Sequence, residues 1–206
     1  MYKVLTLNEK NIWSEYLNKL PLSHQDIYYT PQYYQVYEKN GYGKANCFVF
    51  KKNDDIAIYP FLINCINDLG YDLNDKYFDI QGAYGYNGVI SSCHEPSFIN
   101  GFFKEFSKFC LSRNIIAEFT RFNPILKNQN FSKENITCSF NRNTVSVDLN
   151  QSNNDIISQY SNSCKRAIKK AKKNNLKVKV YRKIYPFIDV FTQMYYKTMN
   201  RLNSDK

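Results

Sequence analysis

The sequence lacks the short motifs by which several large enzyme classes are identified. It contains no G-x-x-x-x-G-K-[ST] phosphate loop, no G-x-G-x-x-G dinucleotide fingerprint, no G-x-S-x-G nucleophile elbow and no H-E-x-x-H zinc motif. Only two histidines are present, His24 and His94, and they are far apart in the chain. These absences argue against phosphate-loop nucleotide hydrolysis, an α/β-hydrolase nucleophile and a histidine-based zinc centre.

Patterns for metal binding, disulfides and membrane insertion are also missing. The six cysteines are widely spaced and form no C-x-x-C pair, so we expect reduced thiols, no metal and no disulfide framework. The N-terminus has no apolar signal core, and no apolar run reaches membrane-spanning length. We therefore expect a cytoplasmic protein without a transmembrane segment.

Acidic residues are absent from one stretch, and this absence explains the net charge of +10. Between Ser163 and Lys183 there are ten basic residues and no acidic one, whereas the rest of the chain holds 18 of each sign. A local excess of positive charge favours contact with phosphates or another anionic partner. The alternative is a solvated helix face that binds nothing.

Glycine is scarce, yet three of the seven glycines lie within residues 81–88, three positions apart and separated by tyrosines. Glycine permits positive φ angles and close approach of other groups, and tyrosine adds a flat ring and a hydroxyl. This glycine-tyrosine loop, as we call residues 81–88, is either an elaborate turn or the wall of a binding site.

Hydrophobic periodicity predicts a mixed order of helices and strands. Pro60 lies in one predicted strand and lacks an N–H donor, so we expect it at a bulge or a sheet edge. The strand over 115–122 is expected to be buried. Helices are expected over residues 8–20, 31–41, 95–113, from 153 or 154 to 173, and 186–202. Strands are expected over residues 45–51, 56–63, 77–80, 115–122, 144–149 and 176–180.

Four short strings occur in an order that resembles the Fem-type (peptidoglycan bridge-forming) aminoacyl transferases and related GNAT-superfamily acyltransferases. The strings are Tyr59-Pro60-Phe61-Leu62, Tyr84-Gly85-Tyr86-Asn87-Gly88, Glu118-Phe119-Thr120-Arg121-Phe122-Asn123-Pro124, and Thr144-Val145 ahead of Arg166-Ala167-Ile168-Lys169-Lys170-Ala171. The resemblance spans nearly the whole chain.

The resemblance implies an α+β fold with a GNAT-like, mixed but mainly antiparallel sheet flanked by helices. Residues 1–152 would form an acceptor-side GNAT-like domain. Residues 153–206 would form a basic linker helix followed by the first strand and helix of an incomplete second GNAT-like unit.

The resemblance also implies transfer of an aminoacyl or acyl group to an amine of a cell-wall or surface-glycan precursor. Aminoacyl-tRNA is the candidate donor, and a nucleotide- or lipid-linked sugar or peptide precursor is the candidate acceptor, which is compatible with peripheral membrane contact. The candidate substrate-binding residues are Tyr84, Gly85, Tyr86, Gly88 and Arg121, and the candidate phosphate-binding residues are Lys165, Arg166, Lys169 and Arg201.

Two features depart from the family pattern. The acidic residue that many members carry soon after the loop has no counterpart, because Val89 to His94 intervene before Glu95, so no catalytic residue is assigned. The loop does not match the [RQ]-x-x-G-x-[GA] motif that binds CoA, so no cofactor is expected.

Two other functions stay open on the sequence. One is a CoA-dependent N-acyltransferase that acts on an amino sugar. The other is a non-catalytic module for RNA or other anions, in which the basic segment contacts phosphates and tyrosines stack on bases.

Overall fold

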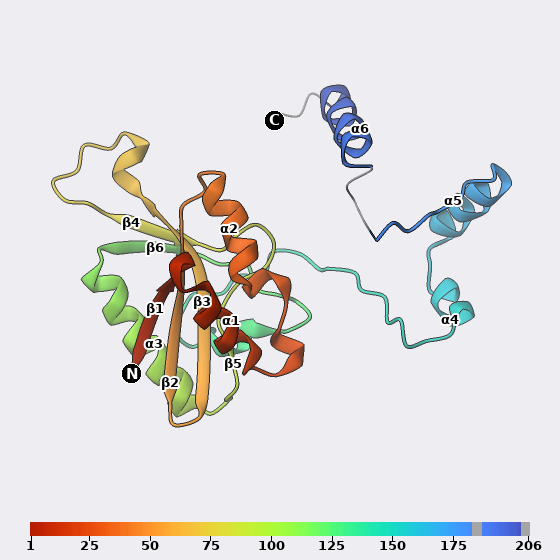
Figure 1. Ribbon diagram of the computed structural model, residues 1–206. Helices are drawn as coiled ribbons and strands as arrows, with labels where there is room; N and C mark the ends of the chain where they lie inside the picture. The colour runs from red at the N-terminus through yellow and green to blue at the C-terminus, as the bar shows by residue number, and fades with distance from the viewer. Residues whose placement is uncertain (183–186, 203–206) are drawn as a thin grey trace. The chain divides into compact units, whose positions relative to one another are not determined.

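The computed structural model describes residues 1–182 and 187–202, and the chain divides into two compact units, Met1–Thr144 and Val145–Lys206. The first unit is a mixed α+β fold with an open, mainly antiparallel sheet flanked by helices (Figure 1). At this level the predicted fold class is confirmed. In the described part of the second unit, all regular secondary structure is helical.

The sheet of the first unit has the strand order β1-β2-β3-β4-β6, and the short strand β5 pairs separately with β3. Neighbouring strands are antiparallel except β4 and β6, which are parallel. The strands predicted over 45–51 and 56–63 are confirmed as β2 and β3, which pair as a hairpin, and Asn53 takes the positive φ of 57° in its turn. The strands are β1 (Tyr2–Thr6), β2 (Lys44–Lys52), β3 (Asp55–Cys65), β4 (Phe78–Gln81), β5 (Ile90–Ser91) and β6 (Ile115–Phe119).

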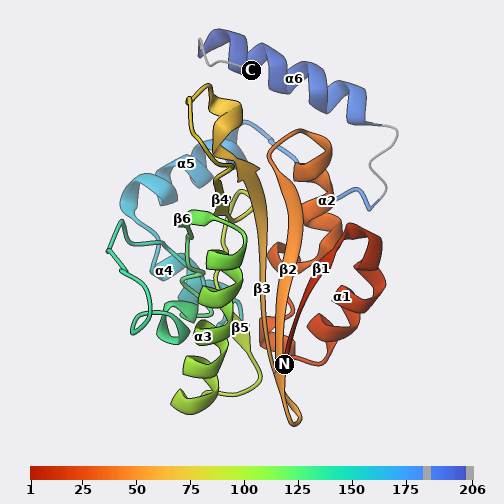
Figure 2. The same cartoon turned by 90° about the vertical axis from the view of Figure 1, so that its left-hand side faces the viewer.

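Helices cover both faces of this sheet, as Figures 1 and 2 show. Helices α1 (Lys10–Asn18) and α2 (Pro31–Lys39) pack on one face, and α3 (Pro96–Ser112) packs on the other. Helix α2 begins as its sequence predicts, because the Thr30 side chain accepts a hydrogen bond from the Tyr33 N–H and Pro31 occupies the first turn. Short 3₁₀ turns are η1 (Leu7–Glu9), η2 (Leu22–His24), η3 (Ile27–Tyr29), η4 (Ile66–Leu69) and η5 (Asn128–Phe131).

The core between the sheet and α3 is largely aromatic. The ring of Phe48 on β2 lies 5.4 Å from that of Phe102 and 5.2 Å from that of Phe106, both edge-on. The ring of Tyr59 on β3 also packs on Phe106, with the ring centres 5.3 Å apart. Edge-to-face packing of this kind favours a fixed arrangement of rings beyond the gain from burial alone.

The opposite core, under α1 and α2, uses rings with polar groups. The Trp13 indole N–H donates to the Tyr29 carbonyl at 2.9 Å, and the Trp13 ring packs 5.5 Å from Tyr34. Both rings are fully buried. Their polar atoms are therefore paired, as burial requires.

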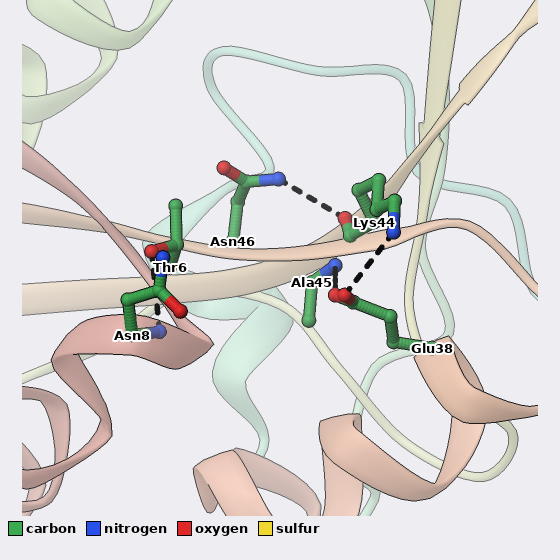
Figure 3. Close-up of polar contacts among 6 residues, drawn as sticks. All are labelled: Thr6, Asn8, Glu38, Lys44, Ala45 and Asn46. Carbon is green, nitrogen blue, oxygen red and sulfur yellow. Dashed lines mark hydrogen bonds and ion pairs between the residues drawn. The ribbon is translucent and has the colours of Figure 1, made fainter.

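Polar contacts fix the chain where α2 leads into β2 (Figure 3). The Glu38 carboxylate accepts the Ala45 N–H at 2.7 Å and lies 3.4 Å from the Lys44 ammonium group. Thr6, at the end of β1, accepts the Asn8 N–H and so caps the turn that leads to α1. These contacts set the points at which helix and strand directions change.

Three predicted strands differ from the structure. Residues 144–149 and 176–180 form no strand, and their alternating side chains are exposed, for example Val145 at 96% and Val178 at 92%. An alternating pattern needs a partner strand to form a ladder, and neither segment has one among residues 1–182 and 187–202. The strand predicted over 115–122 is present as the shorter β6, Ile115–Phe119. It was expected to be buried, but all its residues except Ile115 are exposed, because β6 is an edge strand.

The single helix predicted from 153 or 154 to 173 is wrong, because this stretch forms two helices. Helix α4 (Asn153–Ser158) is capped by Ser152 and α5 (Asn162–Lys173) by Ser161, each through a side-chain oxygen that accepts a backbone N–H. The cap at Ser161 starts a new helix, whereas the sequence pattern predicted one continuous helix. Helix α6 (Ile188–Arg201) follows, and the predicted start at Pro186 lies outside the described residues.

The aromatic core gives a direct test of stability. Phe102→Ala removes a fully buried ring from α3 and should lower the free energy of unfolding by about 3–5 kcal/mol. Leu111→Ala, on the same helix but 78% exposed, should change it by less than about 0.5 kcal/mol. Urea denaturation followed by circular dichroism measures both, and equal effects would contradict the assigned core.

Candidate binding site

The sheet splits along β3, and the site lies at this split. Strand β4 pairs with residues 62–65 of β3, whereas β5 pairs with Ala57 and Ile58, so the middle of β3 has no strand partner on that side among the described residues. Pro60 lies in this gap. We expected Pro60 at a bulge or a sheet edge, and this is wrong in detail because β3 is an interior strand. Pro60 nevertheless lies where β3 has no ladder on one side, so the N–H that proline lacks is not needed there.

Tyr34 fills the gap with its hydroxyl group. This group donates to the Pro60 carbonyl at 3.0 Å and accepts the Ala83 N–H at 3.5 Å. Burial raises the pKa of Tyr34 well above its ordinary value, so the hydroxyl stays protonated and can donate. The side chain replaces part of the missing ladder and ties α2 to the loop after β4.

A pocket of about 450 Å³ opens beside the end of β4. Aromatic side chains form much of its wall, and three of them are largely exposed: Tyr42 at 56%, Tyr84 at 75% and Phe119 at 64%. Arg121, exposed just after β6, is the charged residue in the lining. The pocket is lined by Tyr37, Tyr42, Leu62, Gln81, Gly82, Ala83, Tyr84, Gly85, Asn87, Phe119 and Arg121.

The structure brings together three of the five predicted substrate-binding residues. Tyr84, Gly85 and Arg121 line the pocket, whereas Tyr86 and Gly88 do not. Tyr86 instead packs edge-on against Tyr28 at 5.5 Å. Gly88 is buried.

The glycines of the loop serve packing within the chain. A Cβ at Gly85 would lie 2.3 Å from the Tyr28 ring, and a Cβ at Gly88 would lie 2.7 Å from Asn128 Nδ2 and 2.8 Å from the Phe122 ring. Both glycines also have positive φ angles, 111° and 106°. Protein side chains fill the space next to both glycines. At these two positions the geometry therefore agrees with the interpretation of the loop as an elaborate turn.

The buried side chain of Asn128 contacts the glycine-tyrosine loop through hydrogen bonds. Its amide Nδ2 lies within hydrogen-bonding distance of the Asn87 carbonyl at 2.9 Å, the Val89 carbonyl at 3.2 Å and the Tyr29 hydroxyl at 3.0 Å. Its Oδ1 accepts the Asn123 N–H at 2.9 Å. A single buried amide thus connects the loop to η3 and η5, and sequence reasoning did not identify it.

Asn87 was also missed as a candidate, although it lies inside the loop string. Its backbone N–H donates to the Arg121 carbonyl at 2.6 Å, which joins the loop to the chain after β6. Its side chain is 1% exposed, and neither Nδ2 nor Oδ1 has a hydrogen-bond partner. Buried polar atoms without partners are uncommon in folded proteins.

A second polar cluster lies on the α3 side of the sheet. The Tyr59 hydroxyl donates to Glu118 Oε1 at 2.5 Å and also contacts the Thr120 hydroxyl. Glu118 is exposed as a residue, but its carboxyl group points to buried Tyr59, and desolvation raises its pKa against the opposing effect of these hydrogen bonds. Burial, and then the Glu118 charge, raise the pKa of the Cys110 thiol to about 12.

The predicted phosphate-binding residues lie in the second unit. Lys165, Arg166 and Lys169 share one face of α5 with Asn162, and the Lys165 ammonium group donates to the Ser158 carbonyl at 2.8 Å. Arg201 is exposed in the last turn of α6. The structure therefore groups three of the four on one helix.

Within the described ranges, no group of three or more histidine, cysteine or acidic side chains could hold a metal ion. No described helix combines the length and apolar character needed to cross a bilayer. Comparisons with protein-family models, curated proteins and solved structures found no match.

Two glycine substitutions separate the effect of close packing at Gly88 from the effect of its positive φ angle. Gly88→Ala should lower the free energy of unfolding by about 2–4 kcal/mol, because a methyl group there meets both an unfavourable φ and close side chains. Gly41→Ala is the matched control, since Gly41 has a φ of 80° but no heavy atom within 4 Å of the added Cβ, and should cost about 1–2 kcal/mol. Equal losses in chemical denaturation would contradict the packing role.

Glu118 should make stability depend on pH. Because its pKa is raised in the folded state, the native protein binds the proton more tightly, and the stabilisation present below the ordinary value of 4.5 is lost as pH rises through the folded pKa. Glu118→Gln should remove this decline, a difference of about 1 kcal/mol or less given solvent screening.

Urea unfolding from pH 4 to pH 8 measures this difference. Glu134→Gln, at an exposed carboxyl group of the same unit, provides the control. Parallel curves for the wild type and Glu118→Gln would show that Glu118 does not contribute.

Proposed function

We propose that the first unit binds the acceptor of a Fem-like aminoacyl or acyl transferase in the pocket beside the glycine-tyrosine loop. The observation that carries this proposal is the lining itself, in which exposed aromatic rings surround one arginine. Aromatic walls bind the apolar faces of sugars or bases, and a guanidinium group pairs with phosphate or carboxylate through charge-assisted hydrogen bonds. A nucleotide- or lipid-linked precursor combines these features.

The split in the sheet supports this use of the fold. Leu62 of β3, Gln81 of β4 and the loop after β4 line the pocket, and concave pockets of this kind commonly bind small ligands. Attack of an amine on an activated carbonyl requires positioning and proton removal, with no covalent nucleophile on the protein. A pocket that orients the acceptor is the main contribution the chain would make.

The basic helix α5 is the proposed contact for the phosphates of the donor, aminoacyl-tRNA. Lys165, Arg166 and Lys169 lie on one face of this helix, and clustered cations of this kind bind nucleic-acid backbones in a salt-dependent way.

Calorimetric titration with UDP-N-acetylglucosamine, a nucleotide-linked amino sugar, tests the pocket. Arg121→Ala should weaken binding by roughly 10- to 100-fold, because it removes a charged hydrogen-bond donor. Arg113→Ala, at an exposed arginine outside the pocket lining, should leave binding unchanged.

Equal affinities for the wild type and Arg121→Ala would contradict the proposed role of the pocket. A separate titration with CoA distinguishes the acyl-CoA-dependent alternative, which requires CoA binding that depends on Arg121.

A further inference from the structure

Asn87 stands out among the buried polar side chains of the described residues. Unpartnered buried side-chain atoms occur at only two residues there, His24 (Nδ1) and Asn87 (Nδ2 and Oδ1), and of these only Asn87 lines the pocket. Asn87 therefore carries an unsatisfied donor and an unsatisfied acceptor in the side chain of a residue that lines the proposed site.

Asn128 shows what a structural asparagine looks like in the same region. Both side chains are 1% exposed. Asn128 uses Nδ2 and Oδ1 in contacts with four protein groups, whereas Asn87 uses neither. An amide left unpaired in the interior costs stability, since an apolar side chain of the same shape would avoid the desolvation penalty. The side-chain polar atoms of Asn87 therefore contribute no hydrogen bond to the fold.

We infer that Asn87 is a specificity-determining residue of the pocket and pairs with an amide group of the ligand, as found in an N-acetyl, peptide or carboxamide group. This inference rests on the proposed function of the pocket. A planar amide offers one acceptor and one donor, which match Nδ2 and Oδ1 together. A phosphate or carboxylate would satisfy only Nδ2 and would place negative charge against Oδ1.

The surroundings of Asn87 suit this pairing. Gly82 lines the pocket next to the amide, and a Cβ at this position would lie 2.7 Å from Nδ2. The absence of a side chain at residue 82 therefore leaves the space that the buried Asn87 amide occupies. Arg121 lines the same pocket, and its carbonyl accepts the Asn87 N–H. The ligand class is therefore an anion that carries an amide group.

Two small probes differ only in this feature. N-acetylglycine has a carboxylate and an amide, and O-acetylglycolate replaces the amide N–H with an ester oxygen. Titration of the full chain, followed by ¹⁵N NMR, should show tighter binding of N-acetylglycine by roughly tenfold and a shift of the Asn87 side-chain NH₂ signal. This signal is read in the wild type and does not depend on whether a variant folds.

Two matched variants complete the test. Asn87→Leu should abolish the preference for N-acetylglycine and raise the melting temperature by roughly 2–6 °C, because it removes unpaired polar atoms. Asn128→Leu should lower the melting temperature, because it leaves its protein partners unsatisfied. A loss of stability in Asn87→Leu similar to that in Asn128→Leu would overturn the inference.

The outcomes separate this inference from the proposed function. If both probes bind equally and depend on Arg121, the pocket stands and the role of Asn87 is overturned. If neither probe binds and UDP-N-acetylglucosamine does not bind either, both are overturned.

Discussion

The architecture of the first unit depends on the divergence of β4 and β5 from β3. A long central strand with two short partners leaves backbone groups in its middle without a ladder, and such groups must be paired inside a protein. Tyr34 pairs with the Pro60 carbonyl, and Pro60 itself has no N–H to satisfy. This arrangement allows the sheet to open toward the glycine-tyrosine loop without loss of the core on either face, and the candidate pocket lies beside it.

Two buried asparagines near the loop differ in their roles: Asn128 stabilises the fold, and Asn87 is the residue that we infer to bind a ligand. Asn128 holds the loop through its contacts with Asn87, Val89 and Tyr29, and Asn123 contacts it in turn. Asn87 is held by its backbone, while its side chain is unpaired at the pocket wall. The loop is therefore fixed by the Asn128 amide and by the backbone of Asn87, so the fold does not depend on hydrogen bonds of the Asn87 side chain.

The glycine-tyrosine loop combines tight packing with pocket lining, and Gly85 takes part in both. Gly85 and Gly88 are required by the close approach of Tyr28, Asn128 and Phe122, which is a packing role. Gly85, with Tyr84, also lines the pocket. The proposed chemistry at this site depends on Arg121 and Asn87, which have functional groups able to distinguish ligands, whereas glycine has none.

Elements whose signals are local could be predicted from the residues alone. The Thr30-Pro31 start of α2, the β2–β3 hairpin and the aromatic face of α3 follow from caps, turns and periodicity over a few residues. The strands over 144–149 and 176–180 could not be decided in this way, because an alternating pattern forms a strand only when a partner supplies the ladder. The split at β3 and the unpaired amide of Asn87 were decided by tertiary structure alone, since hydrogen-bond satisfaction depends on groups as far apart in the chain as Tyr29 and Asn128.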